Sequence, residues 1–146
     1  MKQTLSIIVV IFTFIFPSLS WGNVDGKGLI CGTKEKLKYG YTYPSFYIFE
    51  FGYVYNNGIM EKDGIIVTTE GLVQKYETTT SIIRWKIGDL ISTLDRKSLV
   101  LQSRVGEGEL NRQCKVFTKD DLIEEVNRLV KMYQTELEKS ISENKI

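Results

Sequence analysis

The stretch YGYTYPSFYIFEFGYVYN, residues 39–56, holds nine of the seventeen aromatic residues of the 146-residue chain. Eight of the nine have odd numbers, which is the period of a β-strand with one aromatic face. Pro44 cannot donate a ladder hydrogen bond, and Gly52 favours a bulge, so the alternation should be interrupted at both positions. We predict one long strand over residues 46–55, with Tyr47, Phe49 and Phe51 in the core. The tyrosines before the proline are predicted to lie at a rim or edge, where a phenolic hydroxyl can stay wet: Tyr39, Tyr41 and Tyr43.

Outward from this stretch, residues 27–117 are composed of short extended segments separated by turn signals. Asn57-Gly58, Asp63-Gly64 and Glu70-Gly71 are turn dipeptides. LISTLDRKSLVLQS, residues 90–103, alternates on both sides of a polar turn. Because parallel strands need crossovers of a dozen or more residues, these short connections favour an antiparallel meander. The predicted fold is mainly β, a small meander closed as a barrel or a tight sandwich, with one C-terminal amphipathic α-helix.

The two cysteines, Cys31 and Cys114, are predicted to form a disulfide. The alternatives are a pair of buried thiols or two ligands of a metal site, and the chain has no histidine to complete such a site. The bridge would join the first candidate strand to the last, which requires their Cα atoms to lie within about 7 Å. A meander whose first and last strands touch is a curled sheet. Closing so long a loop is worth roughly 4 to 5 kcal/mol in the chain-entropy description.

The first twenty residues, MKQTLSIIVVIFTFIFPSLS, have the layout of a secretory signal peptide. Cleavage is predicted after Ser20, with Gly22 as the alternative. The competing interpretation is a retained membrane anchor, but the twelve-residue apolar run is shorter than the roughly 20 residues that a spanning helix needs. We therefore expect an exported protein, periplasmic or secreted, with a signal peptide over 1–20, a disulfide-closed β domain over 21–117 and a helix over 118–146.

The composition excludes several classes of activity. Removing Lys2 with the signal peptide leaves eighteen basic and eighteen acidic residues, and this zero net charge argues against nucleic acid as a partner. The absence of histidine argues against catalytic triads and histidine-based metal hydrolases, and no cofactor motif is present. An enzyme built from carboxylates stays possible. Glu50 is its candidate acid if its strand face is buried; otherwise Glu50 is an ordinary outward residue.

TKDDLIEEVNRLVKMYQTELEKSISENKI, residues 118–146, is predicted to be a single helix. Thr118 and Asp121 suit an N-cap box, and acidic residues crowd the first two turns. Apolar residues recur at steps of three and four and form one stripe. The stripe consists of Leu122, Val126, Leu129, Val130, Tyr133 and Leu137. We expect it to pack on the barrel or across one of its open ends; the alternative is that it binds a partner or a second copy of the chain.

A cysteine near the start and another near the end of a small exported β barrel resembles the arrangement in periplasmic inhibitors of c-type lysozyme. In that family a serine-glycine loop leading to a tyrosine carries the inhibition. VGEGEL, residues 105–110, does not match this loop. The resemblance therefore covers the signal peptide and the cysteine placement, and no site residue is carried over from it.

The leading functional hypothesis is a non-enzymatic exported binding domain whose partner is a protein, a glycan or a small apolar ligand. Its candidate binding residues are Tyr39, Tyr41, Tyr43, Tyr47 and Trp85. Trp85 alternates with Arg84 in SIIRWKI, residues 81–87, and is interpreted first as a core residue. The alternatives are a carboxylate-dependent hydrolase acting on a polysaccharide, and an envelope structural protein that self-associates through its helix.

Overall fold

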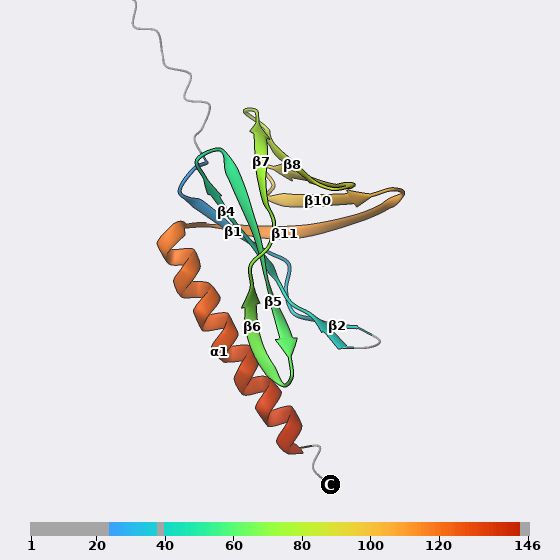
Figure 1. Cartoon of the computed structure of the whole chain (residues 1–146), viewed down its shortest axis with the longest axis vertical. Helices are drawn as coiled ribbons and strands as arrows, with labels where there is room; N and C mark the ends of the chain where they lie inside the picture. The colour runs from blue at the N-terminus through green and yellow to red at the C-terminus, as the bar shows by residue number, and fades with distance from the viewer. Residues whose placement is uncertain (1–23, 38–39, 144–146) are drawn as a thin grey trace, which may run out of the picture.

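The computed structural model describes residues 24–37 and 40–143, which form eleven strands followed by one helix (Figure 1). The strands are β1 (Lys27–Cys31), β2 (Glu35–Leu37), β3 (Gly40–Thr42), β4 (Ser45–Glu50), β5 (Tyr53–Lys62), β6 (Ile65–Thr69), β7 (Val73–Thr78), β8 (Ile82–Ile87), β9 (Leu90–Asp95), β10 (Val100–Val105) and β11 (Gly108–Thr118), and the helix is α1 (Lys119–Glu143). The signal peptide predicted for residues 1–20 lies outside the described residues, and so does Tyr39.

Eight antiparallel strands close into a barrel. Around the barrel the order is β1, β4, β5, β7, β8, β9, β10 and β11, and β11 pairs with β1 again. This order follows the chain, with the β2–β3 hairpin and β6 inserted between barrel strands. The predicted antiparallel meander with a C-terminal helix is confirmed, and its closed form is the barrel.

The disulfide predicted between Cys31 and Cys114 is present, with the two Cα atoms 4.0 Å apart. The two residues face each other in the β1–β11 ladder, and both are buried in the barrel interior. The bridge therefore joins the first strand of the barrel to the last, as the sequence predicts.

The aromatic stretch forms two barrel strands, so the prediction of one long strand over residues 46–55 is wrong. The chain reverses at Phe51 and Gly52, whose φ angles of 54° and 77° make the two-residue turn that suits twisted hairpins. Tyr47 and Phe49 face the core as predicted. Phe51, predicted to be a core residue, is 80% exposed because it occupies the turn. Pro44 does divide the stretch, since it lies between β3 and β4.

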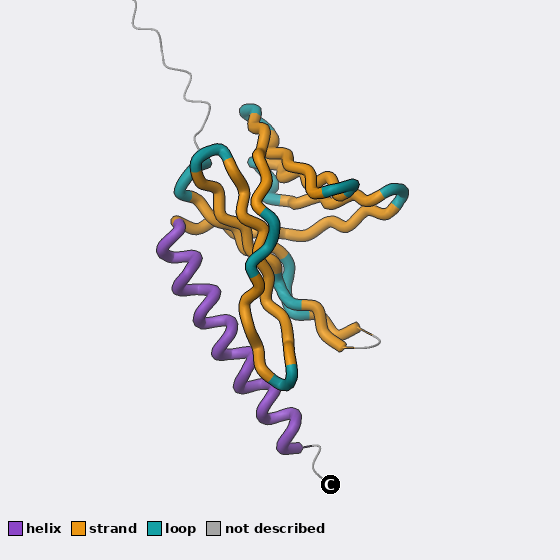
Figure 2. The backbone as a smooth tube through the Cα atoms, viewed as in Figure 1, coloured by secondary structure: helices purple, strands orange, loops and turns teal. Residues whose placement is uncertain are grey.

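The turn predicted at Asn57-Gly58 is wrong, because both residues lie within β5. Along one of its edges, β5 pairs with two different strands in succession. Its first residues pair with β7 and its last residues with β6, so the β5–β6 hairpin extends beyond the barrel (Figure 2). The loop between β6 and β7 crosses β5 so closely that a Cβ on Gly71 would lie 1.4 Å from the Asn56 carbonyl oxygen. Asn57 accepts a hydrogen bond from the Gly71 amide, 3.3 Å. The turn predicted at Asp63-Gly64 is confirmed.

Helix α1 covers one side of the barrel and the β5–β6 extension (Figure 1). Its apolar stripe packs inward: four residues are buried and two are partly buried against them. The buried ones are Leu122, Val126, Leu129 and Tyr133, and the partly buried ones are Val130 and Leu137. Gly28 of β1 allows this approach, because a Cβ there would lie 2.5 Å from Leu122 Cδ2. The Thr118 hydroxyl caps the helix by accepting from the Asp121 amide, 3.2 Å.

Within residues 24–37 and 40–143, α1 lacks the long apolar run that would let it cross a membrane.

Candidate binding site at one mouth of the barrel

A cavity of about 720 Å³ opens at the end of the barrel where β1 stops and β4 begins. The β2–β3 hairpin forms one wall, the far half of β5 forms another, and β11 forms a third. Figure 1 shows this hairpin projecting from the barrel beside the β5–β6 extension. Side chains of mixed character line the space, among them Tyr41, Tyr43, Ser45, Leu110, Asn111 and Arg112. We call this space the mouth cavity.

Arg112 is the charged group set deepest in the barrel wall at this mouth. It lies two residues before Cys114 on β11, so both side chains point to the interior face. Its Nη1 donates to Ser45 Oγ, 2.9 Å, and its Nη2 donates to Tyr47 Oη, 3.0 Å. Its Nε is buried and has no hydrogen-bond partner among the described residues. Gly32 leaves room for the arginine stem, because a Cβ there would press on Arg112 Cδ at 3.3 Å.

Tyr47 and Trp85 lie below the mouth cavity, in the filled interior of the barrel. They are 3% and 2% exposed, and their ring centroids are 5.3 Å apart. The Tyr47 hydroxyl reaches up to Arg112, whereas the Trp85 Nε1 is buried without a partner in the described chain. Both residues are therefore core residues in this structure, and Tyr47 is hydrogen-bonded to Arg112, which lines the mouth cavity.

Tyr41 and Tyr43 contact a cation of the same chain. Lys34 Nζ lies 4.6 Å from the ring centroid of Tyr41, 5.7 Å from that of Tyr43 and 5.3 Å from that of Tyr133 on α1. The same ammonium donates to Glu136 Oε2, 2.7 Å. Burial lowers the pKa of Lys34, but the hydrogen bond and charge of Glu136 outweigh it and raise that pKa overall. This Lys34 cluster ties the wall of the cavity to the helix.

The carboxylates near the cavity are Glu35 on β2 and Glu61 on β5, and both side chains are exposed. Glu50, the candidate acid of the sequence analysis, lies elsewhere. It is half-buried and forms an ion pair with Lys119 at the start of α1, 2.7 Å. Its strand face meets the helix, so Glu50 is placed to anchor the helix. In the described ranges, no three histidine, cysteine, aspartate or glutamate side chains are grouped to hold a metal ion.

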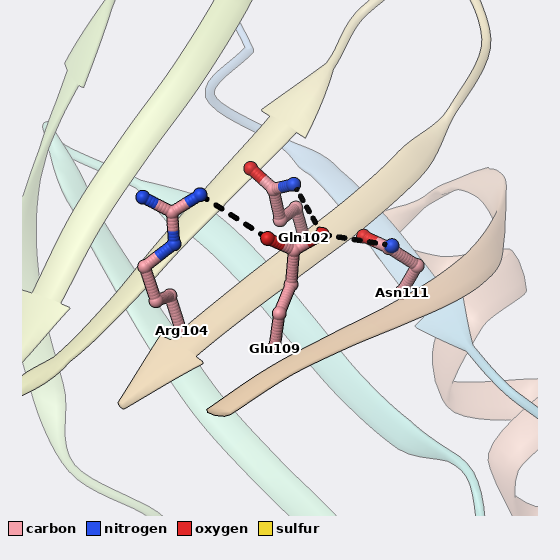
Figure 3. Close-up of polar contacts among 4 residues, drawn as sticks. All are labelled: Gln102, Arg104, Glu109 and Asn111. Carbon is pink, nitrogen blue, oxygen red and sulfur yellow. Dashed lines mark hydrogen bonds and ion pairs between the residues drawn. The ribbon is translucent and has the colours of Figure 1, made fainter. Parts of the chain in front are cut away.

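A polar network covers the outer face of the β10–β11 hairpin (Figure 3). Glu109 accepts from Gln102 Nε2 at 2.8 Å, from Arg104 Nη2 at 3.1 Å and from Asn111 Nδ2 at 3.1 Å. The hydrogen bond from Asn111, followed by those from Arg104 and Gln102, lowers the pKa of the Glu109 carboxyl. Asn111 also lines the mouth cavity, so this network positions the rim of the site.

The opposite end of the barrel is organised around Asp25. Its Oδ1 accepts from the Tyr76 hydroxyl, 2.7 Å, and from the Gly52 amide, 3.2 Å. Burial, together with this hydrogen bond, raises the pKa of Tyr76 to about 12. A smaller space of about 230 Å³ at this end is bordered by buried core side chains such as Leu29 and Phe49.

Comparisons with protein families, with characterised proteins and with solved structures found no match for this chain.

Sequence reasoning missed Arg112, and the signal that could have found it was present. Once Cys114 is assigned to the interior by its disulfide, the alternation of a strand places Arg112 on the same face. An arginine that points into a barrel is unusual enough to mark a candidate site. The sequence did indicate Tyr41 and Tyr43, which line the same cavity.

Proposed function

We propose that this protein is a non-enzymatic binding protein that acts after export, in the periplasm or outside the cell, and holds its ligand in the mouth cavity. The observation that carries the proposal is the 720 Å³ space that combines aromatic, apolar and cationic side chains. Ligand sites are commonly concave, with apolar walls and a few polar groups that fix orientation. The buried disulfide and the signal-like N-terminal sequence support action outside the cytoplasm.

The filled barrel interior directs the proposal to the mouth. The interior is filled by a packed cluster that includes Leu29, Phe49, Trp85 and Leu101. The cavity therefore lies at the rim of the barrel. Aromatic side chains supply contact area with few rotatable bonds, so Tyr41 and Tyr43 suit the wall of a site. A small ligand with an apolar body is the partner class that fits a space of this volume best.

The test is binding of Nile red, a neutral apolar dye whose emission rises in apolar surroundings. The oxidised mature protein should enhance and blue-shift this emission, and Leu110→Ser should weaken binding because Leu110 lines the cavity. Val105→Ser is the matched control: Val105 is 54% exposed and Leu110 55%, on the same hairpin, but Val105 does not line the cavity. Unchanged emission with the wild-type protein would contradict the proposal.

A second candidate function, hydrolysis of a polysaccharide, is favoured by one observation. Glu35 and Glu61 approach the mouth cavity from different walls, and glycoside hydrolysis needs two carboxyl groups on either side of the bond. The check is release of reducing ends from chitin and from peptidoglycan by the wild-type protein and by Glu35→Gln and Glu61→Gln. Release that either substitution abolishes would support the hydrolase; no release above buffer would eliminate it.

A further inference from the structure

Arg112 has no counter-ion among residues 24–37 and 40–143, although it is set into the wall of the barrel. Its two hydrogen-bond partners among the described residues are the hydroxyls of Ser45 and Tyr47, which are neutral. No carboxylate of the described chain lies within ion-pair distance of its guanidinium. A cation that is half-buried without a negative partner lowers the stability of a fold, so its presence needs another explanation.

The two hydroxyls engage only part of the guanidinium. Ser45 and Tyr47 are two residues apart on β4 and present their oxygens on the same side of the strand. Each accepts one N–H, from Nη1 and from Nη2. A guanidinium has five N–H groups arranged as a fork that fits the two oxygens of a carboxylate. β4 therefore holds the fork in a fixed orientation at the mouth cavity and leaves hydrogen-bonding capacity for a ligand.

Lys34, the neighbouring cation, is an example of a structural positive charge whose partners all belong to the chain. Lys34 lies against three tyrosine rings and pairs with Glu136 at 2.7 Å. Its charge is compensated by the chain itself. Arg112 lines the cavity, and no carboxylate in the described part of the chain compensates its charge.

We propose that Arg112 binds the carboxylate of a small ligand with an apolar body, seated in the mouth cavity. This inference depends on the proposed function, since it names the ligand class of the same site. The apolar body would lie against Leu110 and Tyr41, which also line the space. Glu35 and Glu61 border the cavity and would repel a ligand with several negative charges. The site thus favours a single carboxylate over a polyanion.

The test compares cinnamate with its uncharged amide, cinnamamide, as competitors for Nile red at pH 7. The two compounds have the same apolar body and differ in the carboxylate. Cinnamate should displace the dye at about tenfold lower concentration than cinnamamide, because a hydrogen bond from the guanidinium to a charged carboxylate is stronger than one to a neutral amide. Arg112→Gln should remove this difference. Added NaCl should reduce it, and inorganic tripolyphosphate should not displace the dye.

Two further variants separate binding from folding. Lys115→Gln removes the same charge from an exposed position of the same strand, outside the mouth cavity, and should keep the tenfold difference. Arg112→Lys keeps the positive charge but loses the forked guanidinium, so it should retain only part of the tenfold difference between cinnamate and cinnamamide. If Nile red binds and Arg112→Gln leaves the cinnamate preference unchanged, the inference is overturned while the proposed function stands. If Nile red does not bind, the proposed function fails first.

Discussion

Asp25 and Arg112 are charged side chains at opposite ends of the barrel, each with two neutral hydrogen-bond partners, and they differ in what surrounds them. Asp25, where β1 begins, accepts hydrogen bonds from Tyr76 and from the Gly52 amide. Arg112, where β1 stops, has two neutral partners and a buried Nε without any in the described chain. Asp25 is held by two hydrogen-bond donors of the same chain, whereas Arg112 lines an open space of about 720 Å³. We propose a structural role for the first end and a binding role for the second.

The largest expected effect comes from removing the disulfide that joins β1 to β11. Replacing both cysteines, Cys31→Ser with Cys114→Ser, should lower the free energy of unfolding by roughly 4 to 5 kcal/mol, because the bridge closes a long loop of the unfolded chain. The two residues are 83 positions apart and directly opposite in the ladder. Urea unfolding of the double variant and of the oxidised wild type measures the difference. A loss below about 1 kcal/mol would mean that the strand ladder closes the barrel without the bridge.

A second prediction tests the comparison directly through the two charges. Asp25→Ala should cost about 1 to 3 kcal/mol, since it leaves the Tyr76 hydroxyl and the Gly52 amide without their acceptor. Arg112→Met should cost about 1 kcal/mol or less, because removing an uncompensated cation offsets the loss of two hydrogen bonds. Asp25→Asn keeps the acceptor oxygen and serves as the control for charge alone. Equal costs for Asp25→Ala and Arg112→Met in urea unfolding would contradict the division of roles.

The smallest expected effect is a pH dependence at the Asp25 end. Because the folded state raises the pKa of Tyr76 to about 12, the neutral phenol stabilises the fold below pH 10, the ordinary tyrosine value. This contribution should be lost as pH rises from about 10 to about 12. Tyr76→Phe should unfold with a weaker dependence on pH in that window. Absorbance titration of tyrosinate in both proteins checks the assignment, and identical titration curves would contradict it.

The sequence predicted the parts of the fold that local patterns determine. Strand alternation, short connections and the cysteine pair led to a closed meander, and the helical stripe led to a packed helix, with Leu122 and Tyr133 buried. These predictions succeed because burial on one face imposes a period on the residues.

Predictions that depended on tertiary context were wrong or incomplete. Phe51 occupies a turn position with positive φ, which glycine or asparagine usually fills. Asn57-Gly58 has the composition of a turn, but the loop that crosses β5 uses the Asn57 side chain. The Lys34 cluster joins residues 102 positions apart, a separation at which no sequence pattern indicates contact. The mouth cavity likewise combines segments from three parts of the chain.

The proposed role of Arg112 is to bind a ligand carboxylate with the Nη hydrogens that Ser45 and Tyr47 leave unused. The most direct measurement is the NMR resonance of the Arg112 Nε–H in the oxidised protein, assigned by its loss in Arg112→Lys. On titration with cinnamate at pH 7, this resonance should shift because the carboxylate binds the neighbouring Nη groups of the same guanidinium, while cinnamamide should leave it in place. A resonance that does not respond to cinnamate while the amides of Leu110 and Asn111 do respond would show that the cavity binds its ligand without Arg112, and would contradict the claim.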